Sequence, residues 1–279
     1  MAQPVHASAD DALVIADKRF TSRLFLGSSK YPSFEVMVKA IEAAEAELVT
    51  VAVRYMNLDH PDRESVLDHL RRVECHLLPN TAGATTVKQA VRMAHLAREA
   101  TGTHWIKLEV IGDERSLWPD TALTVEATKI LVQDGFVVLP YTSPDLVAAL
   151  RLEEAGAAAV MPLAAPIGTG QGLLDWVGIR RIVERVSVPV VVDAGLGVPS
   201  DAAKAMELGV AAVLVNTAIA EAKDPVAMAR AMKHGVIAGR TAYRAGRMPV
   251  RDEASPSSPV EGVIAERAAR AASVEEAAG

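Results

Sequence analysis

A lysine and a carboxylate alternate on one predicted strand, residues 105–111. Because side chains alternate across a strand, Lys107 and Glu109 share one face, and the apolar residues between them share the other. A charge inside a protein is costly unless it is paired or used. The pattern therefore favours an amine nucleophile with a neighbouring proton carrier. An interior ion pair without a chemical role is the alternative.

A second carboxylate follows the apolar run at residues 186–192. Asp193 stands where this predicted strand ends, and its spacing fits a further acid or base as well as a cap for the next loop. The following Ala194 and Gly195 leave backbone amides that a phosphate can approach. The next predicted strand ends in Asn216 and Thr217, which add polar donors at the same level.

The loop of residues 166–172 contains Gly168 and two further glycines. This composition fits a mobile loop that folds over a ligand, and equally a flexible turn. The loop lacks the Lys-Ser/Thr ending of a nucleotide-binding loop and follows a late strand, so a nucleotide site is a poor fit.

Other reactive residue types predict little chemistry. The seven histidines have no metal-ligand spacing, so we expect no metal. Cys75 is the only cysteine, which excludes an intramolecular disulfide and favours a reducing cytoplasm. No serine lies in a G-x-S-x-G motif, which disfavours serine hydrolase chemistry.

Short β-branched segments alternate with longer segments of helical periodicity. The predicted strands are residues 23–26, 48–53, 76–78, 105–111, 136–140, 158–163, 188–193 and 212–215. Parallel strands joined by helices close most naturally into a (β/α)8 barrel when there are about eight of them. An open, doubly wound sheet is the alternative. In a barrel, the carboxyl ends of the strands form the catalytic rim.

The barrel is expected to be a single domain, residues 13–250, between a flexible N-terminus at 1–12 and a flexible tail at 251–279. Residues 13–20 are predicted to form a hairpin that plugs the barrel's N-terminal mouth. The Ser/Pro run at 255–259 breaks regular structure at the start of the tail.

Composition excludes several kinds of partner. A net charge of −6 gives no basic footprint for nucleic acid or for an anionic membrane. Hydrophobic residues make up 50% of the chain but aromatic residues only 4%, so we expect an aliphatic core. The apolar runs are strand-sized and no signal-like segment starts the chain, which again favours the cytoplasm.

Seven motifs carry a resemblance to a known family. They are residues 78–83 (LPNTAG), 107–113 (KLEVIGD), 137–141 (VVLPY), 166–172 (PIGTGQG), 193–195 (DAG), 216–220 (NTAIA) and 224–232 (DPVAMARAM). Together, in unbroken order from about residue 13 to 259, they resemble thiazole synthase of thiamin biosynthesis.

The resemblance implies a barrel enzyme that joins 1-deoxy-D-xylulose 5-phosphate, dehydroglycine and sulfur into a thiazole phosphate without a bound cofactor. Sulfur would arrive as the C-terminal thiocarboxylate of a small ubiquitin-like carrier protein, and the enzyme would self-associate. Lys107 would form an imine with the sugar ketone, and Glu109 and Asp193 would be its acid/base partners. The phosphate would be held by Gly168, Ala194, Gly195, Asn216 and Thr217.

Two stretches depart from the family pattern: Arg54-Tyr55 stands in place of two arginines, and Leu174-Asp175-Trp176 in place of Leu-Asn-Pro. They bear on the carrier interface and on a helix start. The lysine and the phosphate rim alone also fit another Schiff-base barrel enzyme acting on a phosphosugar, such as an aldolase or a pyridoxal phosphate synthase. A docking scaffold without turnover is the non-enzymatic alternative.

Two finer expectations concern the site. Burial is expected to lower the pKa of Lys107 from its ordinary value of about 10.4. The phosphate is expected to be held chiefly by backbone amides around Gly195 and Asn216-Thr217, with little help from arginine, because this motif has no adjacent cation. Gly195→Val is then expected to obstruct the phosphate while leaving the fold intact.

Overall fold

Eight strands form one sheet in which every neighbouring pair is parallel. In neighbouring order they are β10 (Met161–Pro162), β9 (Val137–Thr142), β6 (Trp105–Leu108), β5 (His76–Asn80), β4 (Leu48–Ala52), β3 (Leu24–Gly27), β12 (Ala212–Val215) and β11 (Val191–Val192). Parallel bridges between Val160 and Val190 and between Leu163 and Asp193 join the two outer strands. The sheet therefore closes into the predicted (β/α)8 barrel, and the open-sheet alternative is excluded.

The structure is a computed structural model that describes residues 11–53 and 64–255. One compact unit ends at Ala245, and the chain from Gly246 onward is a second unit. In the described part of the second unit, residues 246–255, there is neither helix nor strand. The predicted N-terminal segment up to residue 10, the Arg54-Tyr55 departure and the tail beyond residue 255 lie outside the described residues. The domain boundaries at 13 and 250 stay predictions.

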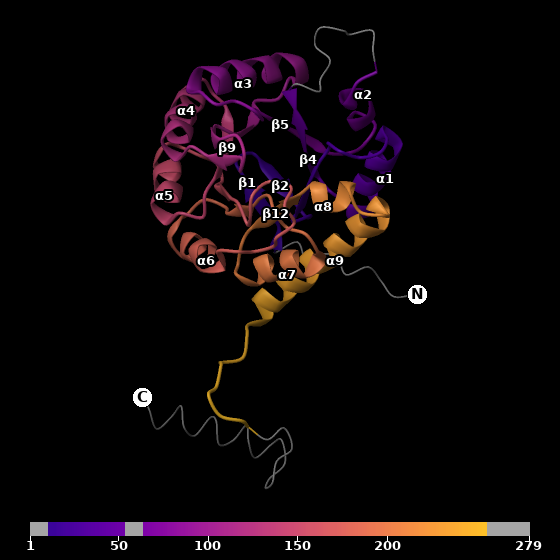
Figure 1. Ribbon diagram of the computed structural model, residues 1–279, viewed down its shortest axis with the longest axis vertical. Helices are drawn as coiled ribbons and strands as arrows, with labels where there is room; N and C mark the ends of the chain where they lie inside the picture. The colour runs from indigo at the N-terminus through magenta and orange to yellow at the C-terminus, as the bar shows by residue number, and fades with distance from the viewer. Residues whose placement is uncertain (1–10, 54–63, 256–279) are drawn as a thin grey trace. The chain divides into compact units, whose positions relative to one another are not determined.

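Helices surround the barrel wall (Figure 1). They are α1 (Phe34–Ala44), α2 (Val66–Leu70), α3 (Val87–Thr101), α4 (Thr121–Gln133), α5 (Leu146–Glu154), α6 (Trp176–Arg185), α7 (Pro199–Glu207), α8 (Thr217–Ala220) and α9 (Pro225–Ala245). Their starts follow local chemistry: the Asp175 side chain accepts from the Gly178 backbone N–H at 2.8 Å, so α6 begins at Trp176 without the usual proline.

Buried side chains divide into two main layers, as the alternation along β6 predicts. Ile106, Leu108 and Val110 belong to the core between the sheet and the helices. Trp105 belongs to a second core inside the barrel. Leu13, Ile15 and Phe20 of the N-terminal hairpin complete this core and close the N-terminal mouth of the barrel. This hairpin consists of β1 (Leu13–Ile15) and β2 (Lys18–Phe20), and Figure 1 shows it at the centre of the helix ring. The predicted plug is confirmed.

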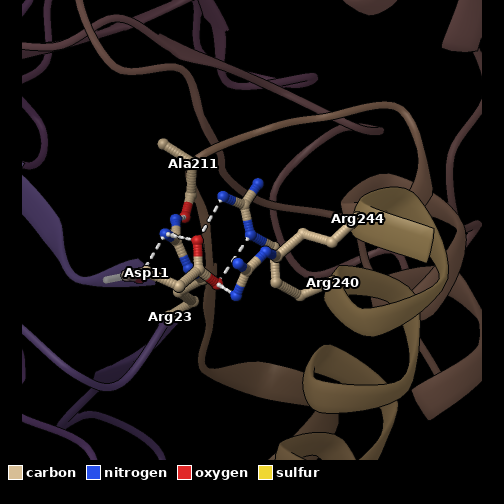
Figure 2. A network of polar contacts seen from close by, with 5 residues as sticks. All are labelled: Asp11, Arg23, Ala211, Arg240 and Arg244. Atoms are coloured by element: carbon tan, nitrogen blue, oxygen red, sulfur yellow. Dashed lines mark hydrogen bonds and ion pairs between the residues drawn. The ribbon is translucent and has the colours of Figure 1, made fainter. Parts of the chain in front are cut away.

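An ion network joins the start of the described chain to α9, the last helix of the described residues (Figure 2). The Asp11 carboxylate accepts from Arg23 at 3.1 Å and from Arg240 on α9 at 2.6 Å, and Arg244 lies 3.6 Å away. Arg23 is buried, and it also donates to the Ala211 carbonyl oxygen at 2.6 Å. The network fixes the segment leading into the hairpin against α9.

Three predicted strands are markedly shorter than expected: 105–111, 158–163, of which only Met161–Pro162 is strand, and 188–193. After Leu108 the chain leaves the barrel wall and forms a separate hairpin, β7 (Ile111–Asp113) with β8 (Trp118–Pro119). In the seventh strand, Pro189 has no N–H for the ladder, so β11 is limited to Val191–Val192 with single bridges beside it. Glu109 and Asp193 therefore stand just beyond the carboxyl ends of their strands.

Candidate active site

A cavity of about 730 Å³ opens at the carboxyl ends of the barrel strands. It is lined by all eight predicted site residues: Lys107, Glu109, Gly168, Asp193, Ala194, Gly195, Asn216 and Thr217. They come from the ends of β6, β11 and β12 and from the loop after β10. The fold thus brings the candidate lysine, both carboxylates and the candidate phosphate residues to one space.

The base of the cavity holds a buried triad of charges. Lys107, Glu109 and Asp193 are 6%, 5% and 2% exposed. The Lys107 Nζ contacts Asp193 Oδ2 and lies 3.5 Å from Glu109 Oε1. The amine is thus held between two carboxylates, and either of them is within reach of its proton.

The pKa of Lys107 is raised, and the expected lowering is wrong for the unliganded site. Burial does act to lower this pKa and is the largest single influence. The negative charges of Asp193 and then Glu109, with the hydrogen bonds to both, outweigh burial together. The resting amine is therefore protonated, and it must lose a proton before it can attack a carbonyl carbon.

Asp193 makes the contact expected of a loop cap and also pairs with Lys107, and its role as an acid or base stays a prediction. Its Oδ1 accepts from the backbone N–H of Ala194 at 2.8 Å, while Oδ2 faces Lys107. Ala194 has a positive φ of 55°, an uncommon conformation for a residue with a side chain. The carboxylate thus caps the loop and pairs with the lysine.

Tyr141 forms part of the wall behind the lysine. It is fully buried, with its ring centroid 5.8 Å from Lys107 Nζ. Burial, followed by the nearby charges of Asp193 and Glu109, raises the pKa of its phenol. Its hydroxyl donates to the Leu117 carbonyl oxygen at 3.3 Å, so the phenol stays neutral and presents an aromatic face to the ammonium.

The loop of residues 166–172 lies against the loop after β11. The Gly172 N–H donates to the Gly195 carbonyl oxygen at 2.8 Å. Gly168 has φ of 78°, and a Cβ there would stand 3.8 Å from Thr217 Oγ1. The glycine-rich loop, Gly195 and the start of α8 therefore enclose one end of the cavity.

Gly195 has a structural role as well as a place in the cavity. Its φ is 74°, and a Cβ there would meet the Ala165 carbonyl oxygen at 2.5 Å. The expectation that Gly195→Val would leave the fold intact is therefore wrong, because the new side chain would displace the neighbouring backbone.

A cation that the sequence reasoning missed stands at this end of the cavity. Lys30 Nζ lies 3.7 Å from the position that a Cβ on Gly168 would occupy, and 2.9 Å from Glu221 Oε1. Lys30 has φ of 69°, and it follows β3 in the chain. The sequence analysis named no cation near these residues, and Lys30, three positions after Gly27 at the end of β3, is one that lies close to Gly168. Whether the phosphate binds without a cation stays a prediction.

Asn216 is held by neighbouring side chains rather than left free in the cavity. Its amide shares a hydrogen bond of 2.7 Å with the Ser29 hydroxyl. A Cβ on Gly27 would meet the Asn216 side chain, so glycine there makes room for the amide. Ser29 itself lines the cavity.

Two negative findings are limited to residues 11–53 and 64–255. Within these ranges, there is no group of three or more His, Cys, Asp or Glu residues arranged to hold a metal ion. Within the same ranges, no helix has both the length and the apolar character needed to cross a membrane.

Comparisons with known proteins identify the family of this chain. Residues 14–259 match the family described as thiazole biosynthesis protein ThiG. Thiazole synthase of Thermodesulfovibrio yellowstonii is 54% identical over 255 residues, which cover 91% of this chain and 99% of that protein. Thiazole synthase of Aquifex aeolicus is 54% identical over 254 residues, 91% of this chain and 95% of that protein.

Solved structures agree on the fold. The Amycolatopsis orientalis BexX/CysO complex superposes with a TM-score of 0.77 at 35% identity, over 86% of this chain and 98% of that one. Thiamine phosphate pyrophosphorylase of Pyrococcus furiosus shares the fold alone, at 17% identity and a TM-score of 0.54, over 78% of this chain and 96% of that one. On the family match over most of its length, the chain belongs to the thiazole synthase family of thiamin biosynthesis.

Proposed function

We propose that this member of the family condenses 1-deoxy-D-xylulose 5-phosphate, dehydroglycine and sulfur from a carrier-protein thiocarboxylate into a thiazole phosphate. The observation that carries the proposal is the amine of Lys107 held between two carboxylates at the base of the cavity. An amine nucleophile and two acid/base groups are what imine chemistry with several proton transfers requires.

The first step is activation of Lys107. Its ammonium passes a proton to Asp193, whose Oδ2 it contacts, and the free amine attacks the ketone carbon of the sugar. The tetrahedral adduct then loses water, with the leaving hydroxyl taking a proton from the Asp193 carboxyl. The product is a protonated imine on Lys107.

The imine draws electrons from the bond between hydrogen and the adjacent carbon. In this proposal Glu109, whose Oε1 lies 3.5 Å from Lys107 Nζ, accepts that proton. Return of the proton to another atom moves the carbonyl group along the sugar chain toward the site of sulfur attack. The later dehydrations need an acid and a base in turn. Two carboxylates around one lysine meet this need.

The phosphate group lies at the other end of the cavity in this proposal. It is surrounded by the backbone around Gly168, Ala194 and Gly195 and by Asn216 and Thr217. The backbone turns sharply at Gly168, Ala194 and Gly195, which have positive φ angles. Lys30 adds a positive charge beside Gly168 once it exchanges Glu221 for the phosphate. In this proposal the carrier's C-terminal segment enters the same cavity to deliver the sulfur.

Partners and location form the remaining part of the proposal. The solved relative BexX is in a complex with a second protein, CysO, which supports a carrier protein as partner here. Self-association follows from the family resemblance alone. A cytoplasmic location is consistent with Cys75 as the single cysteine, because the chain then has no intramolecular disulfide that would require an oxidising compartment.

Incubation with the three substrates tests the proposal. With deoxyxylulose phosphate, freshly generated dehydroglycine and carrier thiocarboxylate, we expect a thiazole phosphate by mass spectrometry. Carrier ending in an ordinary carboxylate is the matched control and should give none. Cleavage of the sugar phosphate, or a pyridoxal-type product, would instead identify another Schiff-base barrel enzyme.

A further inference from the structure

Glu109 lies at a point where regular strand pairing ends. β6 ends at Leu108, and between β5 and β6 the one register pair is Asn80 with Lys107. The next residue after Asn80 is Thr81, which is fully buried. Its backbone N–H donates to the Lys107 carbonyl oxygen at 3.2 Å, so the two segments stay side by side beyond the paired residues.

The Thr81 hydroxyl makes two hydrogen bonds to the backbone of Glu109. It accepts from the Glu109 N–H at 2.8 Å and donates to the Glu109 carbonyl oxygen at 2.8 Å. A hydroxyl is both donor and acceptor, and a side chain without one cannot make this pair of contacts in the same place. The two bonds fix the backbone unit from which the Glu109 side chain leaves.

The direction of that side chain matters because its carboxylate lies 3.5 Å from Lys107 Nζ. We propose that Thr81 is a positioning residue: its hydroxyl holds the backbone of Glu109 so that the carboxylate faces the amine of Lys107. Thr81 lies behind this backbone and does not line the cavity. The proposal rests on the acid/base role proposed for Glu109, and one measurement below is independent of that role.

Three variants separate positioning from general stability. Thr81→Val keeps the shape and removes the hydroxyl, whereas Thr81→Ser keeps the hydroxyl. Thr142→Val is the matched control, because Thr142 is also fully buried, and within the described residues its Oγ1 has no hydrogen-bond partner.

We expect Thr81→Val to lower kcat for thiazole formation by about 10- to 100-fold, because a displacement of about 1 Å at a reacting group has effects of this size. KM for the sugar phosphate should change by less than about threefold, since the phosphate end of the cavity is untouched. Thr81→Ser should recover most of kcat, and Thr142→Val should keep the original kcat.

A double variant tests whether Thr81 acts through Glu109. If it does, Thr81→Val should add little to the loss already caused by Glu109→Gln. Equal losses of kcat from Thr81→Val in both backgrounds would overturn the proposal. So would a Thr81→Ser variant that folds but is as slow as Thr81→Val.

Labelling of Lys107 separates failure of this proposal from failure of the proposed function. Acetic anhydride labelling, mapped by mass and followed against pH, reports the titration of Lys107 without any sugar. Asp193 and the Tyr141 ring also face the amine, so their contributions remain in every variant. If Glu109 is displaced in Thr81→Val, its negative charge lies farther from the amine, and the pH at which half of Lys107 is labelled should fall by up to about one pH unit.

The labelling result stands even if Glu109→Gln makes thiazole at the original rate. In that event the acid/base role of Glu109 is wrong, and a lowered midpoint in Thr81→Val still supports positioning. An unchanged midpoint, together with a normal kcat, would overturn it.

Discussion

The carboxylate of Asp193 contacts the ammonium of Lys107, although β9 and β10 lie between their strands in the barrel wall. The contact therefore crosses the interior of the barrel rather than following a strand pair. It raises the pKa of the lysine that we propose as the nucleophile, so the resting site stores the proton that the first step must move.

Reductive trapping tests the nucleophile. Borohydride added with deoxyxylulose 5-phosphate should leave a covalent sugar adduct on Lys107, because this amine lines the cavity with two carboxylates beside it. Peptide mapping by mass spectrometry locates the adduct. Lys107→Arg keeps the charge but should not be trapped, since guanidinium stays protonated. An adduct on a different lysine of the folded protein would remove Lys107 from the role.

The two carboxylates should be separable from the imine step. Asp193→Asn and Glu109→Gln should each allow trapping while suppressing thiazole formation by about 10²-fold or more, the contribution typical of a positioned acid or base. Single-turnover assays follow the adduct and the thiazole separately. Normal thiazole yield from Asp193→Asn would mean that Asp193 serves the loop through its bond to Ala194 and nothing more.

The pH dependence of trapping should move in a defined direction. In the native protein the raised pKa of Lys107 means that the free amine, and with it trapping, increases as pH rises through the alkaline range. Asp193→Asn removes one of the charges that raise this pKa and leaves burial, which lowers it. The midpoint should shift to lower pH. A midpoint that stays in place would show that the Asp193 charge does not control the amine.

Lys30 should strengthen binding of the phosphorylated sugar relative to the sugar without phosphate. Lys30→Met should raise KM for deoxyxylulose 5-phosphate by about 3- to 10-fold, a modest effect because the side chain is half exposed and screened by salt. KM for 1-deoxyxylulose without phosphate should not change. Lys39→Met, which breaks an exposed pair with Glu35 on α1, is the control. Equal effects of Lys30→Met on both sugars would contradict a phosphate contact.

The Asp11 network should contribute to stability. Asp11→Asn leaves the buried Arg23 without its carboxylate and should lower the free energy of unfolding by about 2 kcal/mol, less than for a fully buried pair because Arg240 and Arg244 reach water. Urea unfolding measures the change, and Glu35→Gln, on an exposed pair, should have a much smaller effect.

The same variant predicts an acid dependence. The hydrogen bond from Arg240, which is the largest influence, holds the pKa of Asp11 below its ordinary value. The stabilisation is therefore present above the unfolded pKa of about 3.9 and is lost as pH falls through the lower folded value. The difference between the native protein and Asp11→Asn should shrink in that acid range; a constant difference would assign the effect to packing.

Periodicity along the chain was sufficient to predict the barrel and to place the side chains of Lys107 and Glu109 on the same face of their strand. Lys107 and Glu109 share a face by the twofold repeat of a strand, and Asp193 stands at a strand end, where barrel sites lie. These statements depend on local sequence. The plug hairpin also followed from local sequence, because the apolar residues of two short strands joined by a turn need another part of the fold to bury them.

Contacts between distant loops were not predictable in the same way. The approach of Lys30 to Gly168 depends on a left-handed lysine in one loop and a left-handed glycine in another, and the sequence has no signal for the lysine's conformation or for the meeting of the two loops. The early end of β6 was missed because the Thr81 hydroxyl bonds Glu109 after the ladder has ended. The predicted direction of the Lys107 pKa shift was wrong, because that direction depends on how close Asp193 and Glu109 lie to the amine. Only the folded barrel sets these distances.

The bonds from Arg240 to Asp11 span 229 positions in the chain. During synthesis on the ribosome, Asp11 emerges well before its partner on α9. The segment leading into the hairpin therefore lacks its contacts with α9 while most of the barrel is being synthesised. Completion of the fold is tied to the synthesis of α9. A nascent chain that stops before α9 would hold Asp11 through Arg23 alone and would leave the segment before the hairpin more open to proteases or chaperones.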